Sequence, residues 1–214
     1  FVALASWLPR YYVGAYDLSL EAAGTLAALY ALPASVFRAL GGWLSDKLGA
    51  RAVMYWTFGV SLVCLFVLSY PETRYVVSGI DGPIGFSFGI PVALFTILTF
   101  ILGFVMSLGK AAVYKHIPVY YPDHVGSVGG LVGMIGGLGG FVLPIAFGVM
   151  NDLTGVWTSC FMLLFLVVAV SMIWMHFAIL RMERRRVPAL EREPHFRYLP
   201  EIQPDYKREH PVSH

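Results

Sequence analysis

The chain has 214 residues, of which 57% are hydrophobic and only 13% are charged, about half the charged share of an ordinary soluble domain. Its formal net charge of +2 is too small to indicate nucleic-acid binding. Its two cysteines, Cys64 and Cys160, lie within apolar runs and indicate neither a disulfide framework nor a metal pair. The composition therefore indicates a membrane protein.

Five stretches are apolar and long enough to cross a bilayer, for which about 20 residues are needed. The opening run, residues 1–15, rises too little along a helix for a full crossing, so we expect a partial span there. The sequence predicts an all-α fold, a polytopic bundle of transmembrane helices over residues 1–181. The full spans are expected at residues 22–44, 52–70, 91–116, 125–150 and 155–180.

The loops between these spans divide by charge. Lys47 and Arg51 follow one span, Lys115 and Arg181 follow others, and the alternate loops are mainly acidic. Because Lys and Arg collect on the cytoplasmic side, we expect these basic loops in the cytoplasm and the protein in the cytoplasmic (inner) membrane. Residues 182–214, rich in Pro, Arg, Glu and His, are predicted to be a disordered cytoplasmic tail, either solvated or in weak contact with lipid headgroups.

Arg38 is the one charged residue within the span 22–44. It precedes Asp46 by eight residues, which is about 12 Å of helix rise from the cytoplasmic end. An arginine at this depth costs at least about 2.5 kcal/mol on insertion, so we expect it to face a polar cavity or a partner. Its planar fork suits a flat oxyanion such as nitrate, nitrite or a carboxylate. The alternative is an arginine that snorkels to the interface or forms a structural pair.

Lys110 is a second embedded cation, six residues before His116. Beside a substrate path it would raise the affinity for an anion. A desolvated lysine can also lose its proton, which would couple anion movement to protons. Snorkelling toward the cytoplasmic headgroups is the alternative.

Between Gly126 and Gly140 the chain contains eight glycines in fifteen residues, among large apolar side chains. Overlapping pairs four residues apart would leave a smooth groove along one helix. The groove would serve either as a helix-packing face or as the wall of a substrate path. The candidate groove residues are Gly130, Gly133, Gly136, Gly137 and Gly140.

Neither a cofactor nor an enzyme activity is expected. His176 is the one histidine within a span, whereas a transmembrane b-haem needs two axial ligands. The sequence has no Ser/His/Asp, Walker or metal-ligand spacing. Aromatic residues near the span ends, among them Trp7, Tyr11, Tyr12 and Tyr114, are expected to lie at the membrane interfaces.

Residues 42–51, GWLSDKLGAR, resemble the G-x-x-x-D-R/K-x-G-x-R/K loop of major facilitator superfamily transporters. A glycine at the first position would permit close helix packing. The aspartate would cap a helix or pair with a base, and the bases would hold the loop in the cytoplasm. The motif positions are occupied by Gly42, Asp46, Lys47, Gly49 and Arg51.

Residues 37–46 resemble the eighth helix of NarK-type nitrate/nitrite porters, where an arginine at the position of Arg38 binds the anion. Residues 126–140 resemble the nitrate signature of helix eleven in the same family. Residues 109–118, which include Lys110, resemble the end of helix ten in its proton-coupled branch. The resemblance implies the C-terminal half of a major facilitator fold, helices seven to twelve, beginning within helix seven.

The resemblance also implies a function, secondary active transport of nitrate, nitrite or both by rocking of two halves around a central anion site. The expected partners are the anion, in the proton-coupled case a proton, the lipid bilayer and an N-terminal six-helix half of the same transporter; nucleic acid is not among them. Two alternatives stay open. One is a carrier of another small anion, and the other is a non-transporting membrane anchor or assembly subunit.

Overall fold

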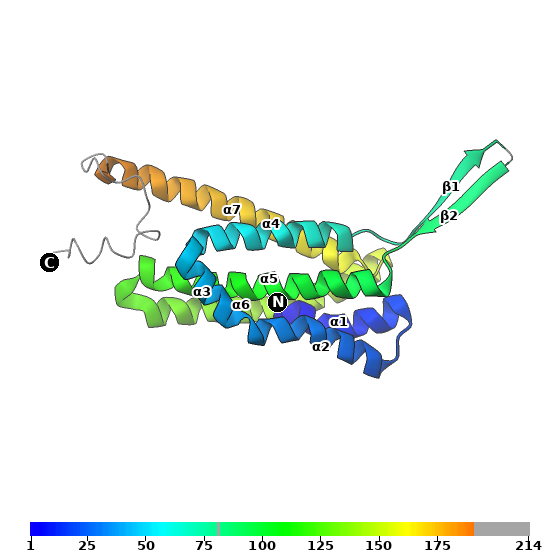
Figure 1. Cartoon of the computed structure of the whole chain (residues 1–214), viewed down its shortest axis with the longest axis horizontal. Coiled ribbons are helices and arrows are strands. Elements are labelled where there is room, and N and C mark those ends of the chain that lie inside the picture. The colour runs from blue at the N-terminus through cyan, green and yellow to red at the C-terminus, as the bar shows by residue number, and fades with distance from the viewer. Residues whose placement is uncertain (81, 191–214) are drawn as a thin grey trace.

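The computed structural model describes residues 1–80 and 82–190, and this part of the chain is a helix bundle with one β-hairpin (Figure 1). Within the described residues, five helical stretches are long and apolar enough to cross a membrane, the same number as the predicted full spans: Leu20–Leu48, Ala50–Leu68, Val92–Pro118, Pro122–Thr154 and Ser159–Arg181. The elements are α1 (Val2–Tyr16), α2 (Leu20–Val36), α3 (Arg38–Leu48), α4 (Ala50–Leu68), β1 (Thr73–Gly79), β2 (Gly82–Phe88), α5 (Val92–Tyr120), the short 3-10 helix η1 (Pro122–His124), α6 (Val125–Thr154) and α7 (Ser159–Leu190).

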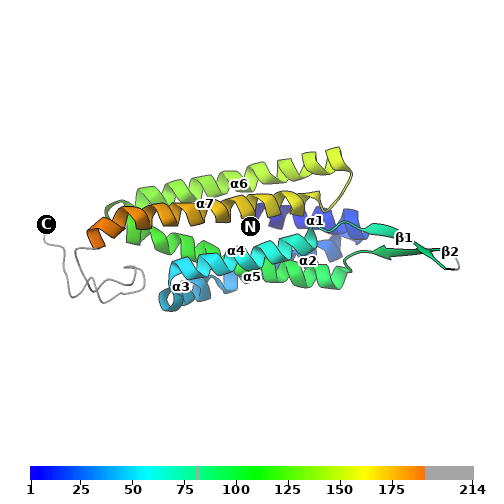
Figure 2. The ribbon, with the colours of Figure 1, turned by 90° about the horizontal axis from the view of Figure 1, so that it is seen from above.

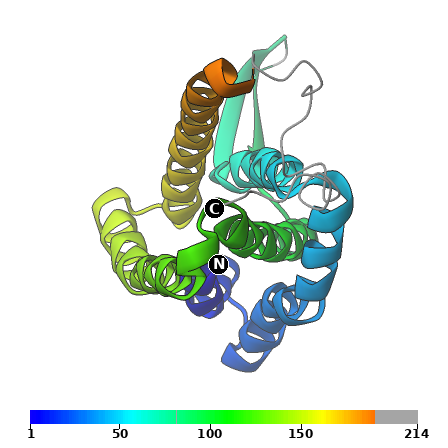
Figure 3. The ribbon, with the colours of Figure 1, turned by 90° about the vertical axis from the view of Figure 1, so that its left-hand side faces the viewer.

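Helix α5 is the centre of the bundle (Figure 3). It contacts α2, α3, α4 and α6, and α4 also packs on α7. The helices run roughly along one long axis, with the hairpin at one end and α3 near the other (Figure 2). The residues before and after α5 therefore lie at opposite ends of the bundle.

The short helix α1 supplies much of the buried core. Its buried residues recur at helical spacing, and Leu8 and Tyr12 are fully buried. Tyr11 stacks on Phe95 of α5 with ring centroids 4.8 Å apart and meets Phe161 of α7 edge-on at 5.2 Å. Trp7, Tyr11 and Tyr12 therefore face the protein interior and not lipid, because these rings fill the space between α1, α5, α6 and α7.

The predicted span 22–44 consists of two helices that meet at Phe37. Pro33 lies inside α2 and has no backbone N–H, and the N–H of Phe37 donates to its carbonyl oxygen at 2.9 Å. Phe37 leaves the helical conformation with φ −92° and ψ 5°, and α3 begins at the next residue. Arg38 is consequently the first residue of a helix, a position that the continuous apolar pattern did not predict.

Gly103 and Gly41 bring the backbones of neighbouring helices close together. A Cβ at Gly103 of α5 would lie 2.4 Å from the carbonyl oxygen of Tyr30 in α2. A Cβ at Gly41 of α3 would lie 2.9 Å from the Cα of Leu108 in α5. Only glycine allows the backbones to approach so closely, which is the role that small residues have in membrane helix packing.

We expect Gly103→Ala to lower the melting temperature of the detergent-solubilised protein, because the added methyl group forces α2 and α5 apart at a cost of about 1–3 kcal/mol. Gly24→Ala is the matched control, since nothing lies within 4 Å of a Cβ at that position of α2. The control should leave the melting temperature unchanged or raise it, because alanine favours a helix. Equal melting temperatures for the two variants would contradict the packing role of Gly103.

A β-hairpin between α4 and α5 was not predicted. Strands β1 and β2 pair antiparallel, with Tyr75 opposite Phe86 and their rings stacked at 5.3 Å. At the tip of the hairpin Gly79 pairs with Gly82, whose φ of +129° favours glycine. The hairpin projects beyond the helices (Figure 1).

Helix α7 continues past residue 181, the predicted boundary of the membrane domain, and ends at Leu190. Its last part contains Met, Glu and Arg, which favour a helix even outside the membrane. The first residues of the predicted disordered tail are therefore helical. The prediction for residues 191–214 lies outside the described residues.

Candidate functional site

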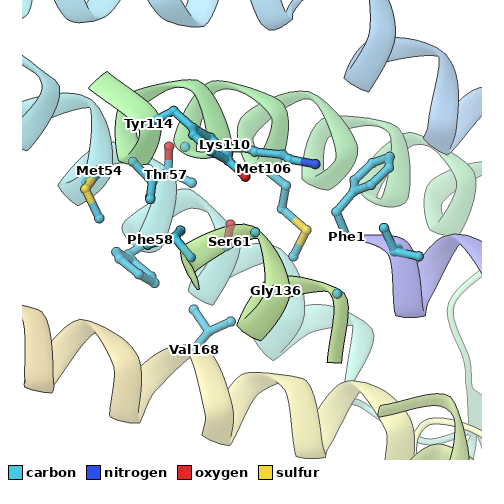
Figure 4. A pocket seen from close by; sticks show the side chains of 16 residues that line it. Phe1, Met54, Thr57, Phe58, Ser61, Met106, Lys110, Tyr114, Gly136 and Val168 are labelled. Atoms are coloured by element: carbon cyan, nitrogen blue, oxygen red, sulfur yellow. The ribbon is translucent and has the colours of Figure 1, made fainter. Parts of the chain in front are cut away.

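A cavity of about 460 Å³ lies between α4, α5 and α6, bounded by the start of α1 and by Val168 of α7 (Figure 4). Its lining is mainly apolar, and the polar side chains come from two helices. Helix α4 contributes Thr57 and Ser61, and α5 contributes Lys110 and Tyr114. Among the described residues that line it, Lys110 is the one with a charged side chain.

Lys110 extends along α5 toward Phe1 (Figure 4). This direction follows from the helix itself, since side chains lean toward the N-terminus of their own helix. The lysine is exposed to the space of the cavity and the surface beyond it. A cation on an apolar wall attracts anions more strongly than it would in water, because the surroundings screen it less.

The glycine run forms the wall of the cavity opposite α5. Gly133, Gly136 and Gly137 line the cavity, and nothing lies within 4 Å of a Cβ at Gly136 or Gly137. Gly130 likewise has open space, whereas a Cβ at Gly140 would lie 3.2 Å from Val2. Within this chain the run therefore supplies mainly open surface, with close contacts to other helices at Gly140, which meets Val2, and at Gly133, where a Cβ would lie 3.3 Å from the Tyr114 hydroxyl.

Arg38 lies outside the cavity that Lys110 and the glycine run line. It is exposed at the first turn of α3 and does not line the cavity. The adjacent Phe37 packs on Phe104 of α5 with ring centroids 5.1 Å apart, which fixes the start of α3 against that helix.

Helix α5 separates the two embedded cations. Gly41 of α3 approaches Leu108 and Ala111 of α5. Because successive residues are about 100° apart on a helix, Lys110 and Val113 point to a different side from Leu108 and Ala111. The structure thus brings Lys110 together with three of the candidate glycines and leaves Arg38 on another face.

The loop motif joins α3, α4 and α5 at the end of the bundle away from the hairpin. Asp46 of α3 forms an ion pair with Lys115 of α5, so the prediction that it pairs with a base is confirmed. Lys47 lies over the Trp43 ring, 4.3 Å from the centroid. Gly49 connects α3 to α4 with φ +83°, a conformation that favours glycine, and Arg51 is half-buried in the first turn of α4.

The expectation that Gly42 permits close helix packing was wrong within this chain. Nothing lies within 4 Å of a Cβ at Gly42, and the neighbouring Gly41 makes the approach to α5. The reason is rotational, since a step of one residue turns the side-chain direction by about 100°.

Sequence reasoning missed Ser61 and Thr57 and assigned Tyr114 to the membrane interface. Ser61 is 2% exposed, and its Oγ has no hydrogen-bond partner within the described structure. The Thr57 hydroxyl donates to the carbonyl oxygen of Val105 at 3.3 Å. The signal was a threonine and a serine four residues apart in a span without charges, which places both on one helix face.

The sequence model of the Major Facilitator Superfamily matches residues 1–209. The chain belongs to the Major Facilitator Superfamily. It is therefore a multi-pass membrane protein of a transporter family, not an enzyme.

Individual relatives confirm the resemblance to NarK-type nitrate/nitrite porters. The chain is 47% identical over 196 residues, 90% of its length, to the probable nitrate/nitrite antiporter NarK1 of Thermus thermophilus. It is 26% identical over 179 residues, 82% of its length, to the nitrite extrusion protein of Bacillus subtilis (strain 168). The matches cover 44% and 41% of these relatives, so the chain spans less than half their length. The comparison with solved structures found no match.

Proposed function

We propose that the chain is the C-terminal half of a secondary transporter that moves nitrate, nitrite or both across the cytoplasmic membrane. The observation that carries the proposal is an exposed arginine at the start of a membrane helix, in a chain 47% identical to a probable nitrate/nitrite antiporter. The two halves rock around a central anion site.

Arg38 binds the anion in this proposal. Its guanidinium donates two coplanar hydrogen bonds, which match two oxygens of nitrate or nitrite. The exposed arginine would face the other half of the transporter, where the anion is held.

Lys110 and the open glycines of α6 form a second polar surface beside this path. The lysine supplies positive charge, and Gly133, Gly136 and Gly137 leave room for a small solute or for movement of α6. The ion pair between Asp46 and Lys115 holds α3 to α5 as one unit during rocking. The basic end of the bundle, with Lys47 and the end of α7, lies in the cytoplasm.

The direct test is nitrate flux in proteoliposomes that contain the intact transporter. Saturable nitrate uptake, inhibited by nitrite but not by sulfate, is expected. Absence of flux above empty vesicles would overturn the proposal. Inhibition by a different anion at lower concentration would favour a carrier of that anion, and co-purification with a stoichiometric soluble protein in place of flux would favour an assembly subunit.

Lys110→Gln should lower nitrate uptake driven by an imposed pH gradient several-fold, because it removes the one charge of the cavity lining. Lys110→Arg, which retains the charge, should keep most of the uptake. Uptake is to be measured with and without the gradient at equal protein content. If Lys110→Gln responds to the gradient as the unmodified transporter does, Lys110 has no part in coupling.

A further inference from the structure

We propose that Ser61, Tyr114 and Lys110 form a second anion site, in the cavity between α4, α5 and α6 and apart from Arg38. The choice of nitrate as its ligand rests on the proposed function. The geometry of the cavity carries the site itself.

The hydroxyl of Ser61 is buried at the cavity wall. This side chain lines the cavity, is 2% exposed and finds no hydrogen-bond partner within the described structure. A buried hydroxyl without a partner costs about 1–3 kcal/mol, so such groups are normally satisfied. The other buried serine of this region, Ser107, follows that rule and donates to the carbonyl oxygen of Phe104 at 2.7 Å. Ser61 therefore has a free hydrogen bond to give to an occupant of the cavity.

The Lys110 side chain extends toward the depth of Ser61 in the bundle. A Cβ at Gly109 would lie 2.6 Å from the Cγ2 of Thr57, which puts these two residues at the same depth of the bundle. Ser61 lies one turn further along α4, about 6 Å toward the hairpin end. Helix α5 runs in the opposite direction, so the Lys110 side chain also leans toward the hairpin end (Figure 4). The ammonium group and the Ser61 hydroxyl thus approach the same depth.

The Tyr114 side chain is a further polar group of the cavity lining. Its hydroxyl oxygen lies only 3.3 Å from the position that a Cβ at Gly133 would take. The tyrosine thus reaches across from α5 to the glycine wall of α6. An alanine at position 133 would press on this hydroxyl, and glycine leaves it in place.

The lining selects the class of ligand. All three polar groups can donate hydrogen bonds, and the one charge is positive. No carboxylate is among the described residues that line the cavity, which excludes a metal cation. The remaining wall is apolar, and transfer of a divalent ion such as sulfate into such a wall costs far more than transfer of a monovalent one. A small monovalent oxyanion fits this combination.

The site has a consequence for transport. Because α5 separates Lys110 from Arg38, an anion in the cavity occupies a position distinct from the one at Arg38. The transporter would then bind one nitrate in the cavity in addition to the nitrate bound at Arg38.

The test is equilibrium dialysis of the purified intact transporter with nitrate, at constant ionic strength set with sulfate. Ser61→Ala should raise the Kd of one nitrate by about tenfold, the size expected for a lost hydrogen bond to a charged ligand. Ser61→Thr keeps the hydroxyl and should restore the affinity. Ser107→Ala, which removes a buried hydroxyl outside the cavity, should change nothing.

The outcomes separate this site from the proposed function. Arg38→Lys should weaken the binding of nitrate at the arginine site. The nitrate binding that depends on Ser61 should be unchanged. If stoichiometry and affinity are the same in the unmodified protein, Ser61→Ala and Lys110→Gln, the cavity site is overturned whether or not nitrate is transported. If Ser61-dependent binding is present but proteoliposomes show no flux, the cavity site stands and the proposed function fails.

Discussion

Arg38→Lys in the intact transporter is expected to reduce nitrate uptake at least about tenfold, although the positive charge is kept. An ammonium group is a compact charge and does not provide two coplanar hydrogen bonds to a flat oxyanion. The position of Arg38 at the first turn of α3 makes the loss specific, because a lysine there would still be exposed and need not disturb the packing of Phe37 on Phe104. Uptake is measured at equal abundance of folded protein.

Arg10→Lys is the matched control. Arg10 is also exposed within a helix, and its guanidinium lies 5.1 Å from the centroid of the Trp7 ring, a contact that a lysine can retain. Uptake in this variant should equal that of the unmodified transporter. Uptake near the unmodified level in Arg38→Lys would mean that Arg38 snorkels or pairs structurally and does not hold the anion.

Gly137→Leu is expected to reduce uptake about tenfold or more, because a leucine at this position projects into the cavity or toward the other half of the transporter. The structure makes this test cleaner than the sequence alone would. Nothing lies within 4 Å of a Cβ at Gly137, so the first atom of the new side chain meets no clash within this chain. A loss of transport in protein that is shown to be folded would therefore report on the path.

Gly59→Leu provides the comparison, since Gly59 of α4 has equally open surroundings but faces away from the cavity, next to Tyr55, Trp56 and Val63. Its uptake should stay within about twofold of the unmodified transporter, as expected for a lipid-facing position. Uptake per folded molecule, with folding checked by size-exclusion profile, decides between the two. Equal losses would show that the glycine run has no special mechanical role.

The membrane class and the five full spans could be read from the sequence, because hydrophobic length is a local property that the bilayer thickness fixes. The sequence also allowed the prediction that Asp46 pairs with a basic residue, since a carboxylate at a helix end among Lys and Arg residues is attracted to their positive charge. Its partner Lys115 was not, because it comes from a helix more than sixty residues away in the chain. The motif residues and the family resemblance could be recognised from short sequence patterns, which do not depend on tertiary contacts.

Helix packing separates the glycines that contact a neighbouring backbone from those that stay open. The dense run on α6 could serve as a packing face or as the wall of a path, but close approaches to a neighbouring helix backbone occur at Gly41 and Gly103, since packing depends on the residue that a neighbouring backbone faces. The same holds for the aromatic rings of α1, which are apolar enough for either the interface or the core. Only the positions of α5 and α7 place them in the core.

The membrane-spanning character of this protein, the place of its basic loops along the chain and its two embedded cations can all be inferred from the amino-acid pattern. This is possible because burying a charge or an unpaired backbone in lipid is costly, whatever the fold. The structure alone decided that α5 stands between Arg38 and Lys110, and that Ser61 presents an unpaired hydroxyl to the cavity with Lys110. These facts depend on the rotation and depth of whole helices relative to one another, which long-range packing sets and no local pattern encodes.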